Sequence, residues 1–143
     1  MKAIITTRYG GTEVLQAGEL PKPVIKANQI LVNVKASSVN SGDVRVRSLG
    51  VRGFARFAMR LAMGWTRPRN PVLGTVFAGT VAEIGPDVKS FKLGDEVFGM
   101  TGMKMGAHAE YLAVPENSAV WFMPQGASFE EAAALVFGGT TAL

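Results

Sequence analysis

The chain has 143 residues, 48% of them hydrophobic, which is enough for one domain with a sizeable core and too few for two ordinary domains. It contains no cysteine, which excludes disulfides and thiolate metal sites. The net charge of +4 is local, because seven arginines and no acid lie between Val44 and Ala82. No apolar stretch approaches the roughly 18 residues of a membrane span, and the first residues form no signal peptide, so we expect a cytoplasmic protein.

The first part of the chain predicts short strands and a loop. Residues 2–7 and 12–19 are expected to form neighbouring strands. Residues 29–36 alternate between two faces, as half-buried strands do. A loop is expected at residues 37–43, where Asn40-Ser41-Gly42-Asp43 has Asx-turn chemistry.

Residues 49–65 predict a helix, because apolar side chains recur at helical spacing and arginines form a row on another face. No recognised nucleic-acid module and no stacking platform accompany the arginines, so we expect no nucleic-acid partner. Three interpretations stay open: binding to an anionic membrane surface, a lid with its apolar face toward a substrate pocket, and a plain solvated helix.

The second part predicts further strands and one more helix. Strands are expected at residues 75–84, 96–99, 108–114 and 119–123. The sequence Ser128-Phe129-Glu130-Glu131 is a capping box that begins a helix, which we expect Gly138-Gly139 to stop. The fold class is therefore mainly β with short helices.

Two chemical signals are weak. His108 is the only histidine and has no cysteine near it, so it cannot supply the three or four protein ligands that a zinc site needs. We interpret it as a strand residue. The spacing of Gly99, Gly102 and Gly106 does not fit a dinucleotide-binding loop. A complete dinucleotide site is therefore not expected in this chain.

Seven short segments follow one another in a specific order. They are Met1-Lys2-Ala3-Ile4, Ser38-Val39-Asn40-Ser41-Gly42-Asp43, Val72-Leu73-Gly74-Thr75, Ala78-Gly79-Thr80-Val81-Ala82-Glu83-Ile84-Gly85, Phe91-Lys92-Leu93-Gly94-Asp95-Glu96-Val97-Phe98-Gly99, Ala109-Glu110-Tyr111-Leu112-Ala113-Val114-Pro115 and Phe129-Glu130-Glu131-Ala132-Ala133-Ala134. Together they resemble the zinc-independent quinone and enone reductase branch of the medium-chain dehydrogenase/reductase family. The resemblance implies a GroES-like, partly open β-barrel over residues 1–137, with residues 138–143 beginning the connection to an absent Rossmann cofactor domain.

The resemblance also implies site residues. Asn40 and Thr75 stand where zinc-containing relatives have a cysteine and a histidine, and neither an amide nor a hydroxyl is a good zinc ligand. We therefore expect no metal. Asn40 and Thr141 are implied to lie near the nicotinamide of NADP or NAD, where each can hydrogen-bond a carboxamide or a substrate oxygen. Asp43 is implied to position its neighbours.

Two positions depart from the family pattern. Arg45 replaces a tyrosine common in quinone reductases, and Val76 replaces an acid, which puts the usual hydrogen-bond network in doubt. If the backbone is extended after Asp43, the side chains of Asp43 and Arg45 face the same side. Arg45 would then either stabilise an enolate oxyanion or simply pair with Asp43.

The resemblance thus predicts the N-terminal catalytic domain of an NAD(P)H-dependent oxidoreductase that reduces quinones or α,β-unsaturated carbonyls. The full-length parent is expected to be a homo-oligomer, and this fragment alone is expected to be inactive. The alternative is a non-enzymatic GroES-like binding module whose arginine-rich helix contacts a protein or a membrane surface.

Overall fold

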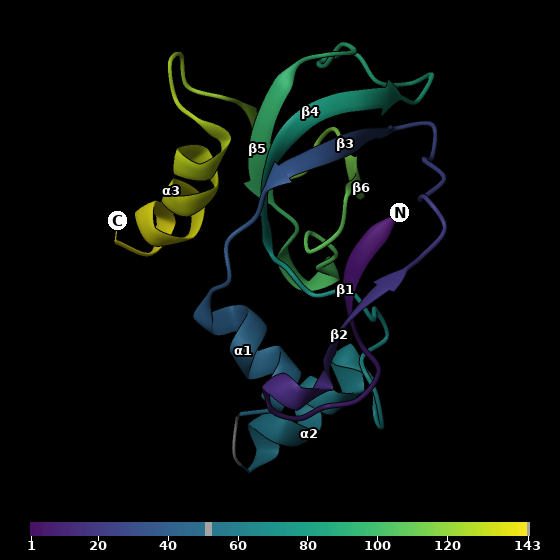
Figure 1. The fold of residues 1–143 in the computed structure, drawn as a ribbon, viewed down its shortest axis with the longest axis vertical. Helices are drawn as coiled ribbons and strands as arrows, with labels where there is room; N and C mark the ends of the chain where they lie inside the picture. The colour runs from purple at the N-terminus through teal and green to yellow at the C-terminus, as the bar shows by residue number, and fades with distance from the viewer. Residues whose placement is uncertain (51–52, 143) are drawn as a thin grey trace.

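The computed structural model describes residues 1–50 and 53–142, without the side chains of residues 140–142. The chain forms two antiparallel sheets and, within the described ranges, three α-helices (Figure 1). The prediction of a mainly β fold with short helices is confirmed. No helix in these ranges is both long and apolar enough to cross a membrane.

The larger sheet contains five strands in the order β6-β3-β4-β5-β7. Its strands are β3 (Gln29–Ala36), β4 (Val76–Ile84), β5 (Glu96–Met100), β6 (Tyr111–Pro115) and β7 (Val120–Phe122). The bounds of β3 agree with those predicted from its alternation. One face of this sheet buries the main core, which includes Ile30, Val32, Phe77, Val97 and Leu112. Burial of these apolar side chains is the main force that holds the sheet together.

The smaller sheet pairs β1 (Lys2–Thr6) with β2 (Leu15–Glu19). The prediction of one strand over residues 12–19 is partly wrong, because Thr12–Val14 form a 3-10 turn (η1). The Gly11 N–H donates to the Glu13 carboxylate at 2.9 Å, and this local bond favours a turn over a strand. A second 3-10 turn, η2 (Gly102–Lys104), follows β5.

Helix α1 (Ser41–Ser48) corrects the prediction of a loop through residue 43. The Asn40 side chain accepts hydrogen bonds from the backbone N–H groups of Gly42 and Asp43, and the Asp43 side chain accepts one from the Asn40 N–H. This reciprocal pattern is a capping box, built from Asn and Asp instead of the commoner Ser and Glu. The polar segment that looked like a turn is therefore the start of a helix.

Helix α2 (Phe54–Met63) confirms the helix predicted over residues 49–65 for its central part. Residues 51–52 of that prediction lie outside the described residues. The helix ends at Gly64, whose φ of 126° is a conformation that side chains rarely tolerate. The Tyr9 hydroxyl donates to the Gly64 carbonyl oxygen at 2.7 Å and anchors this end of the helix beside the β1–β2 connection.

Helix α3 (Phe129–Ala142) starts at the predicted capping box, in which the Glu131 N–H donates to the Ser128 hydroxyl oxygen and the Ser128 N–H donates to the Glu131 carboxylate. The prediction that Gly138-Gly139 ends the helix is wrong. Two glycines cost roughly 1 kcal/mol each in helix propensity. Packing of Ala132, Ala133 and Val136 against Val76 and Ala78 of β4 holds the helix in place. The expected domain boundary at 137/138 falls inside this helix, and the assignment of residues 138–143 to a connection stays a prediction.

Candidate functional site

The candidate site forms where β3 leads into α1 and faces the start of β4. The Asn40 side-chain amide Nδ2 donates to the Thr75 hydroxyl oxygen Oγ1 at 2.6 Å. Thr75 is buried and Asn40 is half-buried. The structure therefore brings together the two residues that the resemblance places at the former zinc-ligand positions.

Asp43 ties this pair to the backbone around it. Its side chain is 3% exposed. One carboxylate oxygen accepts from the Asn40 N–H at 3.0 Å, and the other accepts from the Gly74 N–H at 3.2 Å. The positive end of α1 adds favourable electrostatics for a carboxylate in its first turn. Asp43 thus holds the start of α1 against the residue that precedes Thr75, as a positioning role requires.

Gly74 permits a close approach between its own backbone and the segment that contains His108. Its φ is 98°, and a Cβ atom there would lie 2.6 Å from the backbone nitrogen of His108. Any side chain would therefore clash as well as strain the backbone. The absence of a side chain lets residues 73–74 pair with the segment that contains His108, whose N–H donates to the Leu73 carbonyl at 3.0 Å.

A cavity of about 490 Å³ opens beside Asp43, and we call it the Asp43 cavity. Apolar side chains form most of its wall, and four polar residues also line it: Ser37, Asp43, Arg47 and His108. Arg47 comes one helical turn after Asp43 and so lies on the same helix face. The His108 Nε2 atom is buried and has no hydrogen-bond partner.

A larger cavity of about 620 Å³ lies between β1, β2 and residues 108–110. Of the polar residues around the Asp43 cavity, it shares only His108. None of the predicted catalytic or cofactor-binding residues lines it. Asp43, one of the predicted site residues, lines the Asp43 cavity, and we therefore take that cavity as the candidate site.

Arg45 does not share a side with Asp43, because the backbone between them is helical and not extended. Successive helical residues turn by about 100°, so two residues that are two apart point in nearly opposite directions. Arg45 is exposed, it does not line the Asp43 cavity, and the one ion pair among the described residues joins Lys22 to Glu83 instead. The expected shared orientation is wrong. The catalytic role of Arg45 is untested by this geometry and stays a prediction.

Sequence reasoning missed Arg47. The signal was present in its spacing of four from Asp43, but it had meaning only once the segment was known to be a helix. His108 also differs from its interpretation as a strand residue, because it lies in a bend before β6. Its position in the wall of the Asp43 cavity depends on the close approach to Gly74 and could not be predicted from sequence spacing.

Two other predicted positions have different outcomes. Thr141 lies within α3, and its side chain is outside the described residues, so its proximity to a nicotinamide stays a prediction. Val76 is fully buried and packs in the apolar layer between β4 and α3. A valine is suited to that layer, whereas an acid would need a buried partner.

The donor set of the site is an amide, a hydroxyl and a carboxylate. Within residues 1–50 and 53–142 no cluster of three or more His, Cys, Asp or Glu residues is arranged to hold a metal ion. Asn40 and Thr75 are bonded to each other, and neither offers the nitrogen or sulfur donor that zinc prefers. The arrangement is suited to orienting a neutral polar group.

Comparison with known proteins places these features in a family. Residues 26–125 match the model of the alcohol dehydrogenase GroES-like domain. Quinone oxidoreductase from Sus scrofa is 32% identical over 136 residues, which cover 94% of this chain and 37% of that protein. The 2-methylene-furan-3-one reductase from Solanum lycopersicum is 37% identical over 150 residues, covering 99% of this chain and 36% of that protein.

The fold agrees with the same family. The structure of Escherichia coli quinone oxidoreductase complexed with NADPH matches with a TM-score of 0.80 and 30% identity, covering 99% of this chain and 39% of that one. The chain therefore spans little more than a third of the length of these relatives. The matched domain, the antiparallel sheets and the relatives together show that the chain belongs to the alcohol dehydrogenase GroES-like domain family, within the medium-chain dehydrogenases/reductases.

Proposed function

We propose that this chain is the substrate-side catalytic domain of an NAD(P)H-dependent, zinc-independent oxidoreductase that reduces quinones or α,β-unsaturated carbonyls by hydride transfer. The observation that carries the proposal is the Asn40–Thr75 hydrogen bond, which is joined through the Asn40 N–H to Asp43 in the wall of a largely apolar cavity. An amide and a hydroxyl replace the zinc ligands of related alcohol dehydrogenases, so a carbonyl in this site must be polarised by hydrogen bonds.

In this proposal the site residues bind one edge of a nicotinamide. A reduced nicotinamide supplies the hydride when bound, and the Escherichia coli relative, whose structure holds NADPH, supports this cofactor class. An amide nitrogen has two hydrogens, and Asn40 uses one of them on Thr75. The second can donate to a carboxamide oxygen or to a substrate oxygen. The capping bonds to Gly42 and Asp43 already hold the amide in place, so binding costs little reorganisation.

Asp43, Arg45 and Thr141 have supporting roles in the proposal. Asp43 positions Asn40 through the backbone and does not transfer a proton, since both carboxylate oxygens already accept backbone hydrogen bonds. Arg45 supplies a permanent positive charge in the last turn of α1, which can stabilise a developing oxyanion once a cleft closes over it. Thr141 is assigned to the cofactor by the family resemblance.

The proposed substrate class is the one whose reduction needs no Lewis acid. Hydride adds to an electron-poor carbon or quinone oxygen, the negative charge spreads over the conjugated system, and a proton completes the two-electron reduction. Delocalisation lowers the charge that the site must stabilise at any one oxygen. The names of the pig and tomato relatives, a quinone oxidoreductase and a furanone reductase, support conjugated carbonyl substrates.

The test uses the longest open reading frame that encodes this chain. We expect the product to oxidise NADPH or NADH with 1,4-naphthoquinone or 2-cyclohexen-1-one, and to keep its rate after treatment with a zinc chelator. Asn40→Ala is expected to lower kcat by about a hundredfold, the typical cost of removing one preorganised donor. The matched control Asn117→Ala changes an exposed asparagine in the turn after β6 and should leave kcat unchanged.

Two results would count against the proposal. One is a protein that oxidises neither cofactor with either acceptor. The other is micromolar affinity of the isolated 143-residue chain for NADPH in titration calorimetry, since the pyrophosphate and adenosine contacts are assigned to a following domain.

A further inference from the structure

Helix α2 has an unusual orientation: its largest apolar side chains face outward. Phe54 is 83% exposed, Phe57 51%, Leu61 63% and Trp65, just beyond the helix, 54%. Amphipathic helices normally turn this side toward the core. Met59 and Met63 of the same helix do pack inward, in a cluster with Val46, Leu73 and Met105. The helix is thus anchored by its methionines and presents a second apolar side to solvent.

The exposed side chains form one continuous surface, which we call the α2 face. The rings of Phe54 and Phe57 stack with their centroids 6.2 Å apart. Phe57 and Trp65 meet edge to face at 5.5 Å, with 88° between the ring planes. Exposed Leu61 lies one helical turn after Phe57. Contiguous exposed apolar patches of this kind mark surfaces that contact a partner.

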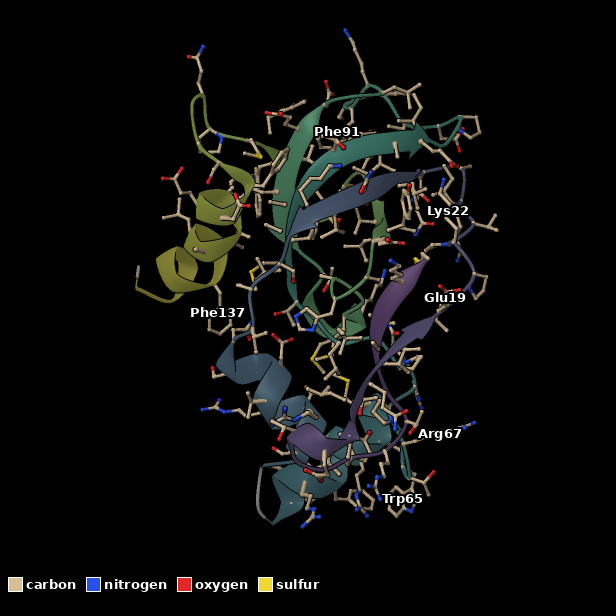
Figure 2. All side chains as sticks on the ribbon, viewed as in Figure 1. Glu19, Lys22, Trp65, Arg67, Phe91 and Phe137 are labelled. Atoms are coloured by element: carbon tan, nitrogen blue, oxygen red, sulfur yellow. The ribbon has the colours of Figure 1, made fainter. Side chains whose placement is uncertain are left out.

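One edge of the α2 face, beside Trp65, is cationic. Arg67 and Arg69 are exposed and line one hollow together with Trp65, and no Asp or Glu occurs anywhere between Val44 and Ala82. Figure 2 shows Trp65 and Arg67 close together at the α2 end of the molecule, with both side chains directed outward. Helix α3 lies away from α2 (Figure 1), and it leaves the α2 face exposed.

We propose that the α2 face binds the surface of an anionic lipid bilayer. Aromatic and aliphatic side chains on one side of a short helix enter the boundary between headgroups and acyl chains, while flanking arginines bind lipid phosphates. Guanidinium groups are suited to phosphate because they can donate two parallel hydrogen bonds. A second copy of this chain is a poorer partner, since docking two α2 faces brings the Arg67 and Arg69 charges of both copies together.

This inference does not depend on the oxidoreductase proposal, because lipid binding needs neither cofactor nor turnover. The assay is flotation of the 143-residue chain with vesicles of equal parts phosphatidylcholine and phosphatidylglycerol, beside vesicles of phosphatidylcholine alone. We expect binding to the anionic vesicles only, and weaker binding as the sodium chloride concentration rises.

Substitutions separate the apolar and charged contributions. The variant F54S/F57S/L61S is expected to lose at least about tenfold in vesicle affinity, because three large apolar side chains no longer enter the bilayer. The matched control V24S/L93S/L135S removes three exposed apolar side chains elsewhere and should bind like the wild type. R67Q/R69Q should reduce the preference for anionic over neutral vesicles.

Each contrary result overturns the inference. Equal binding to both vesicle types, or binding to neither, contradicts the anionic bilayer as the partner. Wild-type binding by a folded F54S/F57S/L61S protein excludes the α2 face as the lipid contact. Sedimentation equilibrium provides a second readout. A dimer that F54S/F57S/L61S abolishes, in the absence of vesicle binding, would assign the α2 face to self-association instead. Far-UV circular dichroism confirms that each variant is folded before it is scored.

Discussion

The buried Asp43 carboxylate offers a quantitative test of how the candidate site is held together. Asp43→Ala removes the acceptor for two backbone donors, the N–H groups of Asn40 and Gly74. A buried donor left without a partner costs about 1 to 3 kcal/mol. Of the two donors, the Asn40 N–H is half-buried and can reach water, whereas the Gly74 N–H is buried. We therefore expect Asp43→Ala to lower the free energy of unfolding by about 3 kcal/mol. Loss of the helix N-terminal charge interaction adds a few tenths.

Urea unfolding of the 143-residue chain, monitored by far-UV circular dichroism, measures this loss. Asp43→Asn should cost roughly half as much, because its amide keeps one acceptor oxygen and turns a donor toward the other N–H. The control Asp87→Ala changes an exposed aspartate in the turn after β4 and should shift stability by less than about 0.5 kcal/mol. A loss below about 1 kcal/mol for Asp43→Ala, or equal losses for Asp43→Ala and Asp87→Ala, would refute the positioning role.

Three further predictions concern α1, α3 and the loop that contains Glu116. Arg45→Met should change the free energy of unfolding by less than about 0.5 kcal/mol, since the exposed guanidinium forms no ion pair with Asp43. The same substitution should lower kcat of the full-length protein about a hundredfold, and a kcat within about twofold of the wild type would contradict the catalytic role. Gly138→Ala should raise stability by about 0.5 to 1 kcal/mol, because a Cβ there meets nothing within 4 Å and the residue lies inside α3; a loss would contradict the continuous helix. The pKa of Glu116 is lowered below 4.5 by hydrogen bonds from the backbone N–H groups of Lys89 and then Ser90. The contribution of Glu116 to the free energy of unfolding is therefore fully present above pH 4.5 and is lost as the pH falls through the lowered pKa. Glu116→Gln should therefore reduce the fall in the free energy of unfolding at acidic pH, as measured by urea melts.

The start of α1 shows where sequence reading reached its limit. The order Asn, Ser, Gly, Asp is equally suited to an Asx turn and to a helix N-terminus, because the same side-chain oxygens can accept the same backbone N–H groups in both. Packing of the residues after the cap decides between the two. Val46 enters an apolar cluster with Met63, Leu73 and Met105, and this packing stabilises the helix beyond its cap.

That choice changed which arginine belongs beside Asp43. On an extended backbone the side chain of Arg45 would point to the same side as that of Asp43. On a helix, Arg47, four positions after Asp43, lies on the same face as Asp43, and Arg47 lines the Asp43 cavity. Thr75 and Asn40 are 35 residues apart, and their hydrogen bond depends on the pairing of β3 with β4. The resemblance identified both residues as replacements of zinc ligands, but it did not predict that they bond to each other.

Local patterns in the sequence determined the elements whose signal is contained within a few residues. The alternation of β3, the capping box of α3 and the helical period of α2 each correctly predicted a type of structure, because backbone geometry repeats at a short, known interval. The orientation of those elements was decided only by tertiary packing. Periodicity shows that α2 has an apolar side, but the inward packing of Met59 and Met63 determines that Phe54 and Phe57 face solvent. Helices with the same period can turn either side to the core, and the free energy of burying one set of side chains depends on residues that are distant in the sequence.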